Sequence, residues 1–89
     1  MQADTKERAA RLGRRIAAVR NLRGLRQADL AELIGVSMFT VSKWERGIQT
    51  PDAHAVALMC AALDCSADYL LGLSETVSRG LHRYRRGTT

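Results

Sequence analysis

The stretch from Gln27 to Arg46, which reads QADLAELIGVSMFTVSKWER, constrains the fold of this chain more than any other. Gly35 separates two short helical patterns and can adopt the left-handed conformation that ends a helix without steric cost. Ala31, in the helix before it, leaves room for a second helix to cross closely. The apolar residues that close the seam are Leu30, Ile34, Val36, Val41 and Trp44. The stretch therefore predicts two helices joined by a tight turn, the second with a polar outer face.

The pattern around this pair predicts a single all-α domain. The chain has 89 residues, which is enough for one small domain and too few for two. It contains one proline and no run of alternating β-branched residues, which favours helices over strands. We predict helices at residues 5–23, 27–34, 38–46, 53–63 and 67–71. The glycines expected to end them are Gly24, Gly35, Gly47 and Gly72.

Capping residues and apolar spacing describe these helices further. Asp4 and Glu7 form a capping-box pattern near the start of the first helix. Ser37, Asp52 and Ser66 are good N-caps for the last three. The residues predicted to be buried are Leu12, Ile16, Val19 and Leu22, then Leu30, Leu33 and Ile34, then Val41, Trp44 and Ile48, and finally Val56, Met59, Cys60 and Leu63.

Charge is distributed unevenly along the chain. Residues 1–51 carry 10 basic and 5 acidic side chains, residues 52–75 carry 4 acidic and no basic ones, and residues 76–89 carry 4 basic and no acidic ones. Nucleic acid is the commonest partner of a molecule polarised in this way. Twelve of the 14 basic residues are arginine, which suits phosphate groups and guanine edges. A biased genome composition explains the preference for arginine about as well.

Several other classes of protein do not fit this sequence. The charged N-terminus predicts no signal peptide, and no apolar run approaches the roughly 20 residues of a membrane span, so we expect a cytoplasmic protein. Cys60 and Cys65 have no companions at metal-ligand spacing and are expected to be small buried apolar residues. His54 and His82 are expected to be ordinary surface residues. No catalytic, cofactor-binding or metal-binding pattern appears, so we predict that the protein is not an enzyme.

The central stretch and its surroundings resemble a known family. The segments GLRQADLAELIGVSMFTVSKWERGIQTPD and CAALDCSADYLLG are similar to lambda-repressor-like DNA-binding domains, the Cro/repressor or XRE helix-turn-helix family. The resemblance covers about residues 10–73. It implies a compact five-helix domain with the helix-turn-helix at its second and third helices. It also implies a transcriptional regulator that binds operator DNA as a dimer and inserts the third helix in the major groove.

The resemblance implies roles for individual residues. The base-facing positions are filled by Met38, Phe39, Ser42 and Lys43. The positions close to phosphates or to the DNA backbone are filled by Gln27, Ser37, Thr40, Arg46 and Gly47, and we also expect phosphate contacts from Arg20 and Arg26. Lys43 can donate to guanine, whereas Lys43 and Arg46 are alternatively solvated surface charges. Arg20 and Glu45 match a pair that ties the first helix to the third in some relatives; the alternative is an exposed surface ion pair.

Two places depart from the family's pattern. Arg26 stands where relatives often have Ser or Thr, so the second helix lacks a side-chain oxygen cap there. Met38 and Phe39 put apolar side chains where relatives often carry polar ones. These two residues either pack on thymine methyl groups or belong to a surface for a protein partner.

The predicted fourth helix has almost no polar face, and a helix that is apolar all round is usually buried on more than one side. The domain is too small to cover both sides, so we expect Leu58 and Ala61 to form a homodimer contact; alanines tolerated on an exposed helix are the alternative. We therefore predict a dimeric, sequence-specific repressor that binds double-stranded DNA. The competing hypothesis is a protein-interaction module, such as an antitoxin-like partner with weak or secondary DNA binding.

The resemblance ends near residue 73, so we predict a domain at residues 1–73 and a basic tail at residues 74–89. The arginines of the tail are Arg79, Arg83, Arg85 and Arg86. The tail is either a flexible arm that binds the phosphate backbone or a disordered solubilising end. Alternatively, Val77, Leu81 and Tyr84 place a short amphipathic helix on a partner.

Overall fold

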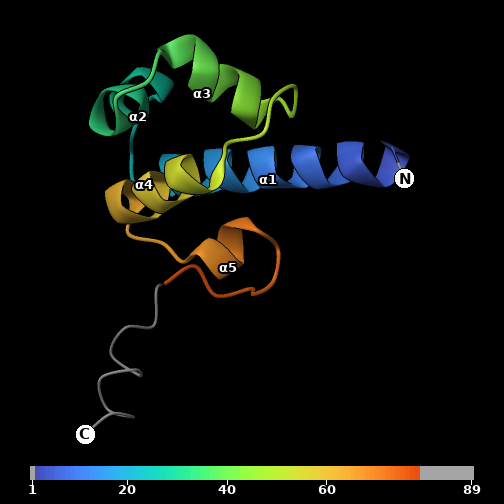
Figure 1. Cartoon of the computed structure of the whole chain (residues 1–89). Coiled ribbons are helices and arrows are strands. Elements are labelled where there is room, and N and C mark those ends of the chain that lie inside the picture. The colour runs from blue at the N-terminus through green and yellow to red at the C-terminus, as the bar shows by residue number, and fades with distance from the viewer. Residues whose placement is uncertain (1, 79–89) are drawn as a thin grey trace, which may run out of the picture.

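The computed structural model describes residues 2–78, which form five α-helices and no strand in this range (Figure 1). The helices are α1 (Gln2–Leu22), α2 (Gln27–Ile34), α3 (Met38–Glu45), α4 (Ala53–Leu63) and α5 (Ala67–Leu70). In Figure 1, α2 and α3 lie on one side of the long α1, and α5 lies on the other. Helix α1 contacts both α3 and α5, while α2 contacts α3 and α4. The predicted all-α fold is confirmed.

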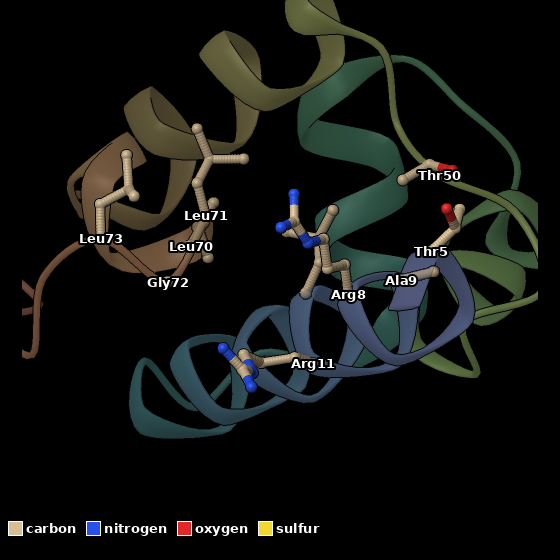
Figure 2. A pocket seen from close by; sticks show the side chains of 10 residues that line it. Thr5, Arg8, Ala9, Arg11, Thr50, Leu70, Leu71, Gly72 and Leu73 are labelled. Carbon is tan, nitrogen blue, oxygen red and sulfur yellow. The ribbon is translucent and has the colours of Figure 1, made fainter. Parts of the chain in front are cut away.

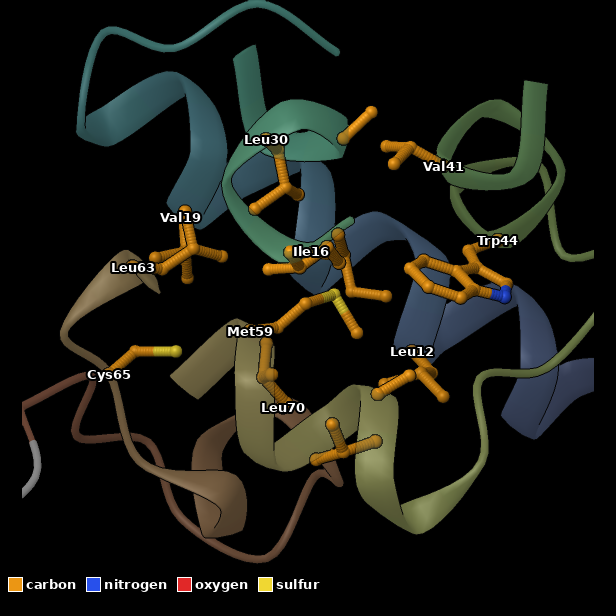
Figure 3. Packing of buried hydrophobic residues seen from close by; sticks show 14 residues of the cluster. Leu12, Ile16, Val19, Leu30, Val41, Trp44, Met59, Leu63, Cys65 and Leu70 are labelled. Carbon is orange, nitrogen blue, oxygen red and sulfur yellow. The ribbon is translucent and has the colours of Figure 1, made fainter. Parts of the chain in front are cut away.

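One apolar core joins all five helices (Figure 3). Ile16, Leu30, Val41, Met59 and Leu70, one from each helix, are fully buried. The other core residues are Leu12, Val19, Ala31, Ile34, Trp44, Ala55, Val56, Leu63 and Cys65. Most of the predicted buried residues are therefore confirmed.

Three residues that we predicted to be buried are exposed: Leu22, Leu33 and Ile48. Leu22 is the last residue of α1, where the helix has passed the edge of the core. Ile48 follows Gly47, whose φ of +75° turns the chain, so the helical spacing no longer applies to it. Leu33 lies beside the stripe that α2 actually buries, which contains Leu30, Ala31 and Ile34.

The start of α1 also differs from the prediction, because the helix begins at Gln2 and Asp4 lies inside its first turn. The capping box of Asp4 and Glu7 is therefore wrong, and Asp4 instead pairs with Arg8 one turn later, at 3.2 Å. The other predicted caps are confirmed. The side chains of Ser37, Asp52 and Ser66 accept hydrogen bonds from the backbone N–H groups of Thr40 (3.1 Å), Ala55 (2.8 Å) and Tyr69 (3.0 Å).

Two arginines, Arg15 in α1 and Arg23 just after it, fasten the C-terminal part of the domain. Arg23 donates to the carbonyl oxygens of Leu63 at 2.7 Å and Asp64 at 2.8 Å, so it satisfies acceptors at the end of α4. Arg15 donates to the carbonyl oxygen of Tyr69 in α5 at 3.0 Å. The position of α5 against α1 therefore depends on side-chain-to-backbone hydrogen bonds as well as on the core.

The packed unit extends beyond residue 73, where we predicted the domain to end. The backbone N–H of Ser66 donates to the carbonyl oxygen of Val77 at 2.9 Å, and Val77 packs against the core. The hydroxyl of Ser66 lies 3.3 Å from the carbonyl oxygen of Thr76, to which it donates. The packed unit therefore includes Val77, and the position of the domain boundary stays a prediction. His82, Leu81, Tyr84 and the arginines of the tail lie outside the described residues, so the hypotheses about the rest of the tail stay predictions.

Candidate nucleic-acid interface

The turn between α2 and α3 has the geometry that the sequence predicted. Gly35 has a φ of +76°, and its N–H and that of Val36 both donate to the carbonyl oxygen of Ala31. Nothing lies within 4 Å of the position that a Cβ would take at Gly35. The backbone angle, and not a lack of space, is therefore what favours glycine there. Ala31 is buried, which agrees with a close crossing of the helices.

Helix α3 presents its outer face to solvent. Phe39 is 70% exposed, and Met38 and Lys43 are exposed as well. Ser42 is half-buried on the same face, whereas Trp44 on the other side belongs to the core. The prediction that Trp44 is a core residue is confirmed. The base-reading roles of the other four stay predictions, and three of the four side chains are open to a partner.

The side chains at the two ends of α3 bond to the helix itself. The Ser37 Oγ accepts from the backbone N–H of Thr40 and lies 3.1 Å from the Thr40 hydroxyl. Near the other end, the Nε–H of Arg46 donates to the Ser42 Oγ at 3.2 Å. Ser37 and Arg46 are nevertheless exposed, and Thr40 is half-buried. Their phosphate contacts stay predictions that this geometry permits.

Glu45 lies at the centre of a hydrogen-bond network that joins three helices. Its Oε2 accepts from the Nε–H of Arg20 at 2.6 Å, and its Oε1 accepts from Nη2 of Arg20 at 3.0 Å. The Oε1 also accepts from the side-chain amide of Gln27 at 2.9 Å. The side chains of Arg20 and Glu45 are only 12% and 7% exposed. The predicted tie between the first and third helices is confirmed, and the alternative of an exposed surface ion pair is wrong.

This network gives Arg20 and Gln27 tasks inside the protein. Arg20 also donates to the carbonyl oxygen of Leu25 at 2.7 Å, so it holds the connection to α2 as well as α3. The hydrogen bond to Glu45 raises the pKa of Arg20 further above its already high value. The predicted phosphate contact of Arg20 stays a prediction, although most of its donors are already used. Gln27 is half-buried at the first position of α2, with its amide held by Glu45.

The start of α2 lacks a side-chain oxygen at Arg26, as predicted, and Asp29 compensates. The Asp29 Oδ2 accepts from the backbone N–H of Arg26 at 2.8 Å, and Oδ1 accepts from its guanidinium at 2.9 Å. These hydrogen bonds, first that from the guanidinium and then that from the backbone, lower the pKa of Asp29. The Arg26 side chain remains exposed, so a DNA phosphate can reach it.

Two glycines let α1 approach the end of α3 closely. A Cβ at Gly13 would meet the carbonyl oxygen of Trp44 and lie 2.5 Å from that of Glu45. A Cβ at Gly47 would lie 3.0 Å from the Cα of Ala10. The N–H of Gly47 donates to the carbonyl oxygen of Trp44 at 3.1 Å. The phosphate contact predicted for Gly47 stays a prediction, with this internal acceptor already in place.

Three of these features were not predicted from the sequence. A glycine inside a helical pattern often indicates a close backbone approach, and this signal was available for Gly13. Asp29 stands at the position where a capping-box acid is expected, so its role was also readable. The hydrogen bond between Gln27 and Glu45 had no signal in the sequence, because it depends on how α2 packs against α3.

Candidate metal sites, membrane-spanning helices and disulfides are all absent from the part of the chain that the structure describes. Residues 2–78 contain no group of three or more His, Cys, Asp or Glu that could hold a metal ion. None of the helices in this range is both long enough and apolar enough to span a membrane. Cys60 and Cys65 form no disulfide; Cys65 is buried as predicted, and Cys60 is half-buried. Burial raises the pKa of the Cys65 thiol to about 12, so it stays protonated at neutral pH.

A helix-turn-helix family model matches residues 16–70, which contain both helices of the pair, their turn and the whole of α4. The chain belongs to the lambda-repressor-like helix-turn-helix family. The resemblance predicted from the sequence is therefore confirmed. This helix-turn-helix family comprises DNA-binding domains and not enzymes, in agreement with the predicted lack of enzymatic activity.

Individual members of the helix-turn-helix family are similar to this chain. It is 42% identical over 67 residues to Repressor protein C2 of Salmonella phage P22, a match that covers 73% of this chain and 31% of that protein. It is 38% identical over 58 residues to the uncharacterized HTH-type transcriptional regulator YazB of Bacillus subtilis (strain 168), covering 65% of this chain and 84% of that protein. The chain thus spans less than a third of the length of the phage repressor.

The fold is also similar to that of a solved helix-turn-helix protein. The crystal structure of the P22 c2 repressor protein in complex with synthetic operator 9T in the presence of Tl+ superimposes with a TM-score of 0.67 at 40% sequence identity. The match covers 71% of this chain and 96% of that one. The predicted lambda-repressor-like five-helix fold is therefore confirmed.

Proposed function

We propose that this protein is a sequence-specific regulator of transcription that binds double-stranded DNA, inserts α3 in the major groove and acts in the cytoplasm as a dimeric repressor. The observation that carries the proposal is the exposed outer face of α3, which the turn at Gly35 and the Glu45 network hold in one orientation. A relative of the same fold is known in complex with a synthetic operator, and this supports DNA as the partner.

In this proposal, base contacts and phosphate contacts come from different parts of the surface. The outer-face side chains that read base edges are Met38, Phe39, Ser42 and Lys43, of which Ser42 is half-buried. The groups that position the domain on the DNA backbone are Arg20, Arg26, Gln27, Ser37, Thr40, Arg46 and Gly47. Arg26 and Arg46 have the most accessible guanidinium groups of this set. Glu45 contributes indirectly, because it holds the Gln27 amide in a fixed place at the start of α2.

A dimer through α4 completes the proposal. Leu58 and Ala61 are exposed one turn apart, while Met59 on the opposite face is fully buried. Leu58 also borders a hollow of about 380 Å³ that Pro51 and Val36 help to line, which offers space for an apolar side chain of a second copy. A two-fold dimer would present its α3 helices to half-sites roughly 34 Å apart, one turn of the DNA helix.

The exposed apolar residues at the start of α3 favour a second candidate function. Phe39 and Met38 together present an aromatic and a thioether side chain to solvent. An antitoxin-like module would use this surface to bind a protein partner, with weak or secondary binding to DNA. The repressor predicts a strong preference for one DNA sequence, whereas the antitoxin-like module predicts weak DNA binding with little sequence preference.

Selection of bound sites from a random double-stranded DNA library with the full chain distinguishes the two candidates. A sequence-specific repressor enriches one motif with two-fold symmetry and binds it on the order of 10³-fold or more tightly than random DNA. Binding that stays weak and equal across sequences, together with a stoichiometric protein partner in pull-down experiments, would replace the repressor with the protein-interaction module.

A further inference from the structure

A groove of about 590 Å³ runs between α1 and the end of α5 (Figure 2). One side is formed by α1, with Arg8 and Arg11, and the other side is formed by the turn that contains Leu71 and Leu73. The groove does not include any residue of the base-reading or phosphate-binding sets. In Figure 1, α3 and α5 lie on opposite sides of α1, so an occupant of the groove would leave the outer face of α3 uncovered.

The α5 side of the groove is an exposed aliphatic surface. Leu71 and Leu73 are 53% and 75% exposed, and they follow Leu70, which is fully buried. Leu12, which is also buried, continues the apolar lining on the α1 side. Two exposed leucines that adjoin buried ones are typical of a surface that a partner covers, because the partner extends an apolar layer already present.

This aliphatic surface is preorganised. The N–H of Leu73 donates to the carbonyl oxygen of Asp68 at 2.7 Å, and that of Gly72 donates to Tyr69 at 3.1 Å. Arg15 ties this segment to α1, because its Nη1 donates to the carbonyl oxygen of Tyr69 at 3.0 Å. Its guanidinium also lies over the aromatic ring of Tyr69, 4.5 Å from the ring centre. A partner therefore binds without first having to order this wall, which lowers the entropic cost of association.

The α1 side of the groove carries positive charge. Arg8 and Arg11 are the charged residues that line it, and no acidic side chain does. Arg8 pairs with Asp4 on the surface of α1, with both side chains more than half exposed, so a partner's carboxylate can replace that weak contact. The stem of Arg11 lies along Gly72, with its Cδ 3.6 Å from the place that a Cβ would occupy. Figure 2 shows the Arg8 side chain rising from α1 towards the opening beside Leu71, while the Arg11 side chain extends along α1.

These properties define the occupant. A small molecule would remain largely uncovered between side chains as exposed as Arg8 and Leu73, whereas small-molecule sites bury most of their ligand. Residues 79–89 of the chain itself carry four arginines and no acid, so their positive charge is repelled by the positive charge of the groove. DNA would satisfy the arginines but not the leucines. The surface matches a peptide with carboxylates along one edge and aliphatic side chains along another.

We propose that this groove binds an acidic amphipathic segment of a partner protein. Its aliphatic side chains pack on Leu71 and Leu73, and its carboxylates pair with Arg8 and Arg11. The binding of DNA by α3 and the binding of this segment are independent, because they use different surfaces. The protein would thus carry a contact for a second protein on the side of α1 that faces away from α3.

A random peptide library displayed on phage tests the proposal without presuming a sequence. The full chain is the bait, and a variant with Arg11→Gln and Leu73→Ser together is used for counter-selection. We expect the enriched peptides to be acidic, with aliphatic residues three or four positions apart. Synthetic copies should bind at least about tenfold more weakly to Arg8→Gln, Arg11→Gln or Leu73→Ser. Arg14→Gln and Leu22→Ser, exposed residues of α1 outside the groove, are matched controls that should leave affinity unchanged.

Several outcomes would overturn the proposal. One is the absence of any enriched peptide, and another is enrichment of peptides that lack acidic residues or bind the groove variants as tightly as the wild type. If Leu73→Ser dissociates a homodimer in sedimentation experiments, the groove belongs to a second copy of this chain. If Arg8→Gln and Arg11→Gln weaken DNA binding and flatten its salt dependence, the two arginines contact phosphates instead.

Discussion

The carboxylate of Glu45 in α3 accepts two hydrogen bonds from the guanidinium of Arg20 in α1, at 2.6 and 3.0 Å, with both side chains almost wholly buried. Paired hydrogen bonds of this kind fix orientation as well as distance. The same carboxylate holds Gln27 at the start of α2. One acidic residue therefore sets the relative position of α3, of α2 that precedes it and of the long α1 that supports both.

The first prediction concerns this pair. Glu45→Gln leaves the guanidinium of Arg20 buried without a charged acceptor, so the free energy of unfolding should fall by about 1.5–3 kcal/mol in urea denaturation. The double variant Arg20→Met, Glu45→Leu should recover most of this loss, because it removes both buried charges together. Wild-type stability for Glu45→Gln would show that the pair contributes nothing.

The second prediction separates base reading from phosphate binding. Lys43→Ala should relax specificity at one base pair and weaken binding to the preferred site by about 1–3 kcal/mol, measured by titration of labelled DNA duplexes. Lys6→Ala removes an exposed lysine from α1 and serves as the control, for which binding should change little. An equal loss by Lys43→Ala on random DNA would mean that Lys43 contacts phosphates and does not read a base.

The third prediction follows from the close approach of α1 to α3. Gly13→Ala introduces a Cβ where the carbonyl oxygens of Trp44 and Glu45 lie, so it should destabilise the fold by about 1–3 kcal/mol. Helix propensity alone predicts the opposite, a gain of about 1 kcal/mol. Thermal unfolding of this variant beside Ala18→Gly, an exposed position of the same helix, separates the two effects. A more stable Gly13→Ala protein would show that the two helices can move apart at little cost.

The fourth prediction tests the dimer. Leu58→Asp places a charge on the exposed face of α4, so it should convert a dimer into a monomer at tens of micromolar and weaken binding to a two-half-site operator. Sedimentation equilibrium measures the mass, and Leu22→Asp on α1, at a leucine that is more exposed than Leu58, is the control. The dimer contact is wrong if the wild type is already a monomer and Leu58→Asp alters neither mass nor DNA binding.

The fifth prediction concerns the stability of the folded protein at acidic pH. Because Arg26 lowers the pKa of Asp29 in the folded protein, the contact adds stability that is fully present above the unfolded pKa of about 3.9. This stability is lost as the pH falls through the lower, folded pKa. The difference in unfolding free energy between the wild type and Asp29→Asn should therefore shrink below about pH 4. Arg26→Ala should remove much of the same pH dependence; if it does not, another group causes it.

The sequence by itself determined most of the helix boundaries, the N-caps of the last three helices and the turn at Gly35. These features depend on signals within a few residues: Ser37, Asp52 and Ser66 cap the helices that follow them, and glycines with positive φ end the helices before them. The same local signals, together with the spacing of the apolar residues, carried the family resemblance. Local hydrogen bonding and helical periodicity need no knowledge of the rest of the chain.

Only the tertiary structure decided what depends on contacts between distant residues. Periodicity could not tell that Leu33 stays exposed, because that depends on where neighbouring helices cross. Nor could it show that Glu45 also holds the Gln27 amide or that the end of α5 forms a groove with α1. Such contacts are set by how the helices pack around one core, where a side chain is buried or exposed according to its neighbours in space.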